Sequence, residues 1–163
     1  MRYIGIRASV QNVYYSVIEK DNVTYKVISI SNIKVPKALD VPQKLSYIRN
    51  TLSTIIEQYK IKYASIREIE GSALGRMNKD SLTRINIEGV IQEIFASSCI
   101  KEYDLACNSR VKSILNSTSN KIIEIADELN LGNNHTTDNS KKLKDENKES
   151  LVVAISMLKK KGE

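Results

Sequence analysis

Residues 2–7 (RYIGIR), 12–19 (NVYYSVIE) and 23–34 (VTYKVISISNIK) decide the fold class. All three segments are rich in Val, Ile and Tyr, which favour extended backbone, and turn-like residues around SVQN and KDN separate them. Apolar and polar residues alternate imperfectly along each segment, as expected where helices cover a face of a sheet. The sequence therefore predicts three consecutive antiparallel strands at the start of the chain.

After the third segment the apolar residues change their period. Over 41–59 they recur at helical spacing, and Pro42 suits the first turn of a helix because its missing N–H has no partner to lose. Residues 62–69 (KYASIREI) predict a fourth strand, 81–96 a second helix and 100–106 (IKEYDLA) a fifth strand. Strands that alternate with helices favour parallel crossovers, so we expect an α/β fold with a mixed sheet.

The last third of the chain predicts helices separated by one long polar segment. Residues 108–116 form the first helical pattern and 119–131 the second, with Ser119 as a candidate N-cap. Residues 132–148 are polar and charged, which predicts a flexible loop or a loosely held entry to the next helix. A final helix over about 147–160 is expected to pack back on the sheet.

The composition is that of a globular protein with one core. The chain has 163 residues, of which 41% are hydrophobic and 27% charged, and this length suits a single domain over 1–163. No apolar run approaches the roughly 20 residues that span a bilayer, and the N-terminus has no secretory signal pattern. We therefore expect a cytoplasmic protein without membrane contact.

The few cysteines and histidines exclude two common kinds of site. Cys99 and Cys107 are too few for a disulfide framework, so we expect reduced thiols. His135 stands alone in a polar stretch, without the neighbouring ligands of a zinc site.

The net charge of +6 and the isoelectric point near 9.2 are compatible with a polyanionic partner. A solvated basic surface explains the same charge and is the preferred interpretation on charge alone. Much of the excess lies in the C-terminal quarter, at Lys141, Lys142, Lys144, Lys148, Lys159, Lys160 and Lys161.

Four stretches carry a resemblance to a known family. YIGIRASVQNVYYSVIE at 3–19 resembles the first hairpin of RuvC-type Holliday-junction resolvases, and ASIREIE at 64–70 resembles their fourth strand. CNSRVKSILNS at 107–117 resembles the segment after their fifth strand, and KESLVVAISML at 148–158 resembles their C-terminal helix. The start and the Ile-basic-Glu tripeptide in strand four are also similar to small bacterial proteins of this fold. The resemblance implies a ribonuclease H-like fold, with a five-stranded mixed sheet of three antiparallel and two parallel strands flanked by helices.

The same resemblance implies where metal ligands would lie. Active enzymes of this fold hold two divalent cations about 4 Å apart with carboxylates. The ligand positions fall on Arg7, Arg67, Glu146 and Glu149, so two of the four carry the opposite charge. An arginine offers donors but no lone pair, and we therefore expect neither the two-metal site nor a cofactor. Glu68 does not replace Arg67, because adjacent strand residues face opposite sides of a sheet.

Two interpretations of Arg7 and Arg67 remain open at this point. The preferred one pairs them with Glu146 and Glu149, so that charge-assisted hydrogen bonds replace a metal cross-link. In the other, the guanidinium groups bind phosphate or the nucleic-acid backbone directly. The basic residues that would join them are Lys141, Lys142 and Lys144.

The favoured function is a domain that has lost two-metal nuclease activity and acts by binding nucleic acid or a protein partner, and is thus not an enzyme. The alternative is a divergent nuclease that depends on Mg²⁺ or Mn²⁺ and cleaves structured or single-stranded DNA. Its catalytic carboxylates would be Glu68, Glu70, Glu146 and Glu149.

A third hypothesis is a homodimer or another assembly formed through the second helix. That helix carries a broad apolar band, most of which we expect to lie in the core: Ile85, Ile87, Val90, Ile91 and Ile94.

Overall fold

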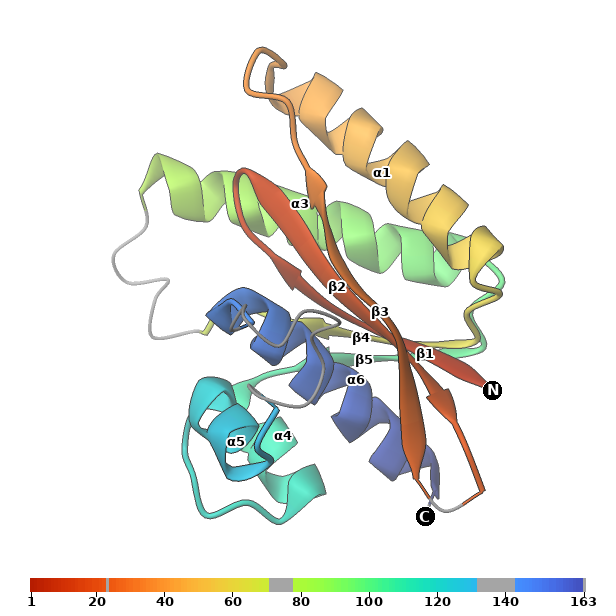
Figure 1. Cartoon of the computed structure of the whole chain (residues 1–163). Helices are drawn as coiled ribbons and strands as arrows, with labels where there is room; N and C mark the ends of the chain where they lie inside the picture. The colour runs from red at the N-terminus through yellow and green to blue at the C-terminus, as the bar shows by residue number, and fades with distance from the viewer. Residues whose placement is uncertain (23, 71–77, 132–142, 163) are drawn as a thin grey trace.

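A computed structural model describes residues 1–22, 24–70, 78–131 and 143–162 of the chain. Five strands form one mixed sheet in the order β3-β2-β1-β4-β5 (Figure 1). The first three strands are antiparallel, and β4 and β5 run parallel to β1, as predicted. The strands are β1 (Arg2–Ala8), β2 (Asn12–Lys20), β3 (Tyr25–Lys34), β4 (Tyr63–Arg67) and β5 (Glu102–Ala106).

Helices cover both faces of the sheet. In Figure 1, α1 and α3 lie together on one face, and α6 crosses the other face with α4 and α5 beside it. This arrangement follows from the strand–helix–strand order, because a helix that connects two parallel strands must cross over a face of the sheet. The helices are α1 (Val41–Gln58), α3 (Lys79–Ser97), α4 (Asn108–Leu115), α5 (Ile122–Glu128) and α6 (Asp145–Gly162).

The alternation of side chains along β1 separates two apolar layers. Ile4 and Ile6 point into the core beneath α1 and α3. Tyr3 belongs to the layer beneath α6, and it stacks on Tyr63 of the neighbouring strand with ring centroids 4.9 Å apart. Because successive strand residues face opposite sides, Arg7 lies on the same face as Tyr3.

Gly5 allows α6 to approach the sheet closely. A Cβ at this position would lie 2.0 Å from the carbonyl oxygen of Ser150 and 2.8 Å from the Cβ of Ala154. The hydroxyl of Ser150 also forms a buried 2.7 Å hydrogen bond with the hydroxyl of Ser16 on β2. The first half of α6 is therefore held directly over β1 and β2.

The ends of the predicted helices are mostly confirmed. Helix α1 begins at Val41 after an Asp40 capping box, with Pro42 in the first turn. The prediction of Ser119 as an N-cap is wrong, because α5 begins later and the Ser119 hydroxyl donates to Glu128 instead.

The predicted loop over 132–148 is only partly testable. Residues 132–142 lie outside the described residues. Helix α6 begins at Asp145, slightly before the predicted start at about 147, so the end of the polar segment is a helix entry rather than a loop. Acidic residues in its first turn suit the positive end of the helix dipole.

Two expectations about the rest of the chain can also be compared with the structure. Cys99 and Cys107 are both unpaired, as predicted. Among the described helices none is long and apolar enough to cross a membrane.

Candidate functional site

Arg7 and Arg67 lie side by side at the carboxyl ends of two neighbouring parallel strands. They are register partners in the β1–β4 pair, and each is the last or next-to-last residue of its strand. Both face the side of the sheet that α6 covers. The carboxyl ends of parallel strands are the usual place for sites in open α/β sheets, so this position defines the candidate site.

Arg7 is bound to the first turns of α6. Its Nε donates a 2.8 Å hydrogen bond to Oε2 of Glu149, and both side chains are about one-fifth exposed. The Nη1 group of Arg7 also donates to the carbonyl oxygen of Ala8. The predicted ion pair between Arg7 and the acidic start of the last helix is therefore present.

Arg67 pairs differently from the prediction. Its Nη1 lies 3.1 Å from Oε1 of Glu70 and donates to the carbonyl oxygen of Glu68, so the expected pairing with Glu146 or Glu149 is wrong for this residue. A partner three residues along the chain is closer than one on α6. Glu70 also accepts from the backbone N–H of Asn108, which ties the end of β4 to the start of α4.

Several buried polar atoms near this strand end have no partner among the described residues. They are Oγ of Ser65, Nε of Arg67 and Oδ1 of Asn147. Buried polar groups in proteins are nearly always hydrogen-bonded to protein, water or a ligand. Arg67 is 9% exposed, and its unpaired Nε therefore retains the capacity to bind another acceptor.

Glu68 directly follows the last residue of β4, and its backbone N–H donates to the carbonyl oxygen of Ala106 on β5. Burial raises the pKa of Glu68 most, and repulsion from Glu88 of α3 is the next largest cause. Glu88 is buried, accepts a 3.1 Å hydrogen bond from the backbone N–H of Ile69, and accepts another at 2.7 Å from Nε of Arg84. Glu68 and Glu88 therefore lie close enough for their charges to interact.

Arg84 is a third arginine of this cluster, and the sequence analysis missed it. The pKa of its guanidinium is lowered first by burial and next by repulsion from Arg7, with a smaller contribution from Arg67. Arg84 therefore lies close enough to Arg7 and Arg67 to be repelled by both. The only signal in the sequence was the i,i+4 spacing of Arg84 and Glu88, which is common on ordinary helix surfaces.

Glu146 lies on the α6 side of the site without an ion pair to either strand arginine. The pKa of Tyr14 on β2 is raised first by burial and then by the charge of Glu146, while Arg7 acts in the opposite direction. Tyr14 therefore faces both charges at the end of the sheet. It is 7% exposed, so its ring is packed inside the protein.

The residues present do not fit a two-metal centre. Guanidinium groups stand at two of the positions where the sequence resemblance implies carboxylate ligands, and they repel cations. Glu149 and Glu70 are already engaged by these arginines. Within the described ranges, no group of three or more His, Cys, Asp or Glu side chains is placed to hold a metal ion.

Of the three lysines predicted beside the arginines, the structure describes Lys144. Lys141 and Lys142 lie outside the described residues. Lys144 is exposed just before α6, and its carbonyl oxygen accepts from the backbone N–H of Lys148. It therefore stands near the acidic start of that helix.

Solved structures with similar folds are Holliday-junction resolvases. RuvC of T. thermophilus, solved alone and with a Holliday-junction substrate, matches with a TM-score of 0.72 at 11 to 12% identity over 99% of this chain and 96% of that one. The chain has the ribonuclease H-like fold of RuvC. The yeast mitochondrial resolvase Ydc2 matches with a TM-score of 0.64 at 12% identity over 96% of this chain and 78% of that one.

The fowlpox virus resolvase, solved with Holliday-junction DNA, matches with a TM-score of 0.56 at 14% identity over the full length of both chains. No family model and no curated protein matches the sequence. The RuvC-like fold predicted from the four sequence stretches is confirmed by these structures.

Proposed function

We propose that this chain is a RuvC-like domain without two-metal nuclease activity that acts by binding nucleic acid. The observation that carries the proposal is the register pair of Arg7 and Arg67 at the sheet end where the resemblance implies metal ligands. The ion pair of Arg7 with Glu149 then joins β1 to α6, as a metal ion would otherwise do, while Arg67 pairs with Glu70 of its own segment. The fold is thus retained without the cations that hydrolysis requires.

Phosphate oxygens could accept hydrogen bonds from the guanidinium donors that remain available at the strand arginines. Arg67 keeps a buried Nε without a partner among the described residues. A planar guanidinium matches phosphate geometry, and contacts of this kind position nucleic acid without reading its sequence. The resolvases of similar fold that were solved with Holliday-junction DNA support branched DNA as the first ligand to test.

The carboxylates of the cluster oppose this binding. Glu68, Glu70, Glu88, Glu146 and Glu149 outnumber the three arginines, so the site by itself carries no positive excess. Any affinity for DNA then depends on opening an Arg–Glu pair or on basic residues nearby. The proposal therefore implies binding that is modest and sensitive to salt.

The test is binding of a labelled four-way DNA junction and of single-stranded DNA, measured by fluorescence anisotropy at several salt concentrations. Wild type should bind without metal, and Arg7→Gln should weaken binding by about threefold to tenfold, because one charged contact is lost. Arg49→Gln is the matched control, since Arg49 pairs with Glu93 between the helices of the opposite layer. Equal effects of the two variants, or no binding by wild type, would contradict the proposal.

One observation favours the alternative, a divergent metal-dependent nuclease. The raised pKa of Glu68 reflects burial together with the negative charges of Glu88, Asp104 and Glu70, and a cation would relieve such crowding. Under this alternative, Mg²⁺ or Mn²⁺ would support cleavage of branched or single-stranded DNA, and Glu149→Gln would abolish it. Under the proposed function, no cleavage appears in either protein.

A further inference from the structure

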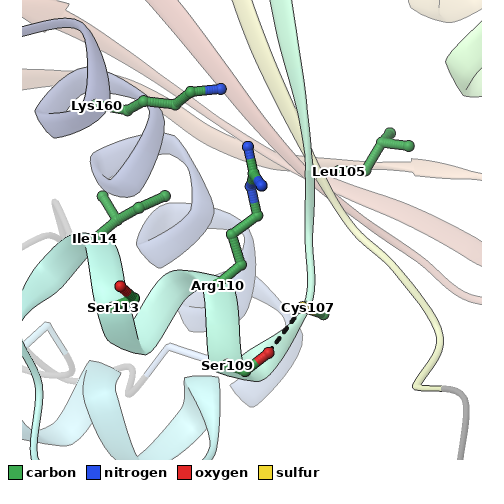
Figure 2. A pocket seen from close by; sticks show the side chains of 7 residues that line it. All are labelled: Leu105, Cys107, Ser109, Arg110, Ser113, Ile114 and Lys160. Carbon is green, nitrogen blue, oxygen red and sulfur yellow. Dashed lines mark hydrogen bonds between the residues drawn. The ribbon is translucent and has the colours of Figure 1, made fainter.

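A second cluster of cations lies away from the strand arginines, beside the edge strand β5. Figure 2 shows Arg110 of α4 and Lys160 of α6 reaching into the same space next to this strand. A cleft of about 600 Å³ opens there. Its lining residues are Leu105, Cys107, Ser109, Arg110, Ser113, Ile114 and Lys160.

A buried carboxylate holds both cations in place. Asp104 is 4% exposed and accepts hydrogen bonds from Nε of Arg110 at 2.8 and 2.9 Å, from its Nη2 at 2.5 Å and from Nζ of Lys160 at 2.9 Å. Burial raises the pKa of Asp104, but the hydrogen bonds from the two cations outweigh burial and leave the pKa below its ordinary value. One anion thus orients two cations.

The two cations keep donors that Asp104 does not use. The Nη1 group of Arg110 has no partner in the part of the chain that the structure describes, and a guanidinium carries five N–H bonds in total. Lys160 has three N–H donors, and its further carboxylate contact, to Glu102, is long at 3.8 Å. Since Asp104 neutralises only one of the two charges, the cleft retains a positive excess.

The remaining lining suits an organic phosphate rather than a bare ion. Ser109 and Ser113 present hydroxyl groups on successive turns of α4, and Ile114 adds aliphatic surface. Ligand clefts of roughly 300–1,000 Å³ with few polar groups and apolar walls are typical of small-molecule sites. An inorganic phosphate ion would leave most of this volume unfilled.

We propose that the cleft between β5, α4 and α6 binds a small phosphate ester of about nucleotide size. Arg110 and Lys160 contact the phosphate, and Asp104 positions them without touching the ligand. The site is separate from the strand arginines and does not depend on the function proposed for them.

The experiment is a titration of the full ¹⁵N-labelled chain with adenosine monophosphate and, separately, with inorganic phosphate, followed by NMR. We expect signals of Ser109, Arg110 and Ser113 to shift, and adenosine monophosphate to bind more tightly than phosphate. Lys160→Gln should weaken binding by about tenfold or more, because a charge-assisted contact is lost. This variant leaves Arg110 to pair with Asp104, so the fold is retained.

Two further variants separate a ligand site from a general charge effect. Ser113→Leu fills the cleft from an exposed helix position without touching an ion pair, and it should block adenosine monophosphate. Lys159→Gln removes the same charge one residue away at an exposed position, and it should bind like wild type. The proposal is overturned if wild-type signals do not move, if Lys159→Gln matches Lys160→Gln, or if a DNA oligonucleotide depends on Lys160 as strongly as the mononucleotide does.

Discussion

Glu149 competes with any bound phosphate for the guanidinium group of Arg7. The carboxylate of Glu149 occupies the Nε donor of Arg7 at 2.8 Å, and a phosphate oxygen that binds there must displace it. Under the proposed function, this pairing stabilises the fold and lowers the affinity for nucleic acid at the same time. Removal of the Glu149 charge should therefore strengthen binding at an arginine-based site, whereas it would abolish activity at a catalytic site that needs Glu149.

Glu149→Gln should raise the affinity for a four-way DNA junction by about threefold to tenfold, because it frees the guanidinium of Arg7. Anisotropy titrations without metal measure this change. Glu93→Gln is the matched control, since it removes the same charge and frees Arg49 on the opposite layer. If both variants gain affinity equally, the effect is one of net charge; if Glu149→Gln loses affinity, Glu149 has a different role.

Asp104 should make the fold sensitive to acid. Its pKa is lower in the folded than in the unfolded chain, so the ionised carboxylate stabilises the fold at pH values above the unfolded pKa of about 4. This contribution is lost as the pH falls through the lower folded pKa. Urea unfolding should show Asp104→Asn destabilised by about 1–3 kcal/mol at pH 7.

The same measurement at lower pH supplies the control. The difference in unfolding free energy between wild type and Asp104→Asn should shrink toward acid, because wild type then also carries a neutral side chain. A difference that stays constant down to pH ~2 would show that packing, rather than ionisation, accounts for the effect.

At the scale of elements, the contact between α6 and β1 places Glu149 over Arg7. Gly5→Ala should destabilise the fold by about 3 kcal/mol or more, because the new methyl group overlaps the backbone of α6 at Ser150. Urea unfolding measures the loss, and the Arg7–Glu149 pair should separate as the helix shifts. Gly89→Ala is the control, since nothing lies within 4 Å of its Cβ and α3 should gain about 1 kcal/mol.

The elements were predictable because their signals are local. Tyr, Val and Ile runs marked β1 to β3, and the local patterns of the following segments marked the helices and the two remaining strands. The prediction of a helix start at Ser119 was wrong because serine is favoured in turns as well as at helix N-termini. Here the Ser119 hydroxyl donates to Glu128. Boundaries of this kind depend on tertiary hydrogen bonds that no short window of sequence contains.

The site was predicted less completely than the fold. Arg7 and Glu149 meet as expected, because fold resemblance fixes which strand and helix ends lie together. Arg67 pairs with Glu70 instead, because the choice among several nearby carboxylates depends on distances of a few ångströms. Arg84 was not predicted as part of the site, because its position depends on how α3 packs. Asp104 and its two cations were not foreseen, since β5 and the end of α6 are far apart in the sequence.

At the scale of the whole molecule, the apolar band of α3 lies inside the protein. Ile87, Ile91 and Ile94 are at most 1% exposed beneath α1 and against the sheet. The band that motivated assembly through this helix is therefore part of the core, as most of it was expected to be. A homodimer or protein partner stays a prediction, which light scattering over a range of concentrations would test.

The charge distribution of the whole molecule bears on whether the sheet end can bind metal ions. The chain keeps the sheet and helix order of RuvC, with a TM-score of 0.72, and carries a net charge of +6. At the sheet end, however, the strand positions that face α6 are occupied by cations already paired with carboxylates. Metal affinity is therefore the property in which this chain should differ most from a two-metal nuclease.

The most direct measurement is calorimetric titration of Mg²⁺ and Mn²⁺ into wild type and into the Arg7→Asp, Arg67→Glu double variant, with circular dichroism to verify that both are folded. The account predicts no binding heat for wild type and clear binding for the double variant, because carboxylates then replace the two guanidinium groups beside Glu149. Wild type that binds either metal with micromolar affinity would contradict it, and nuclease activity would then have to be assayed.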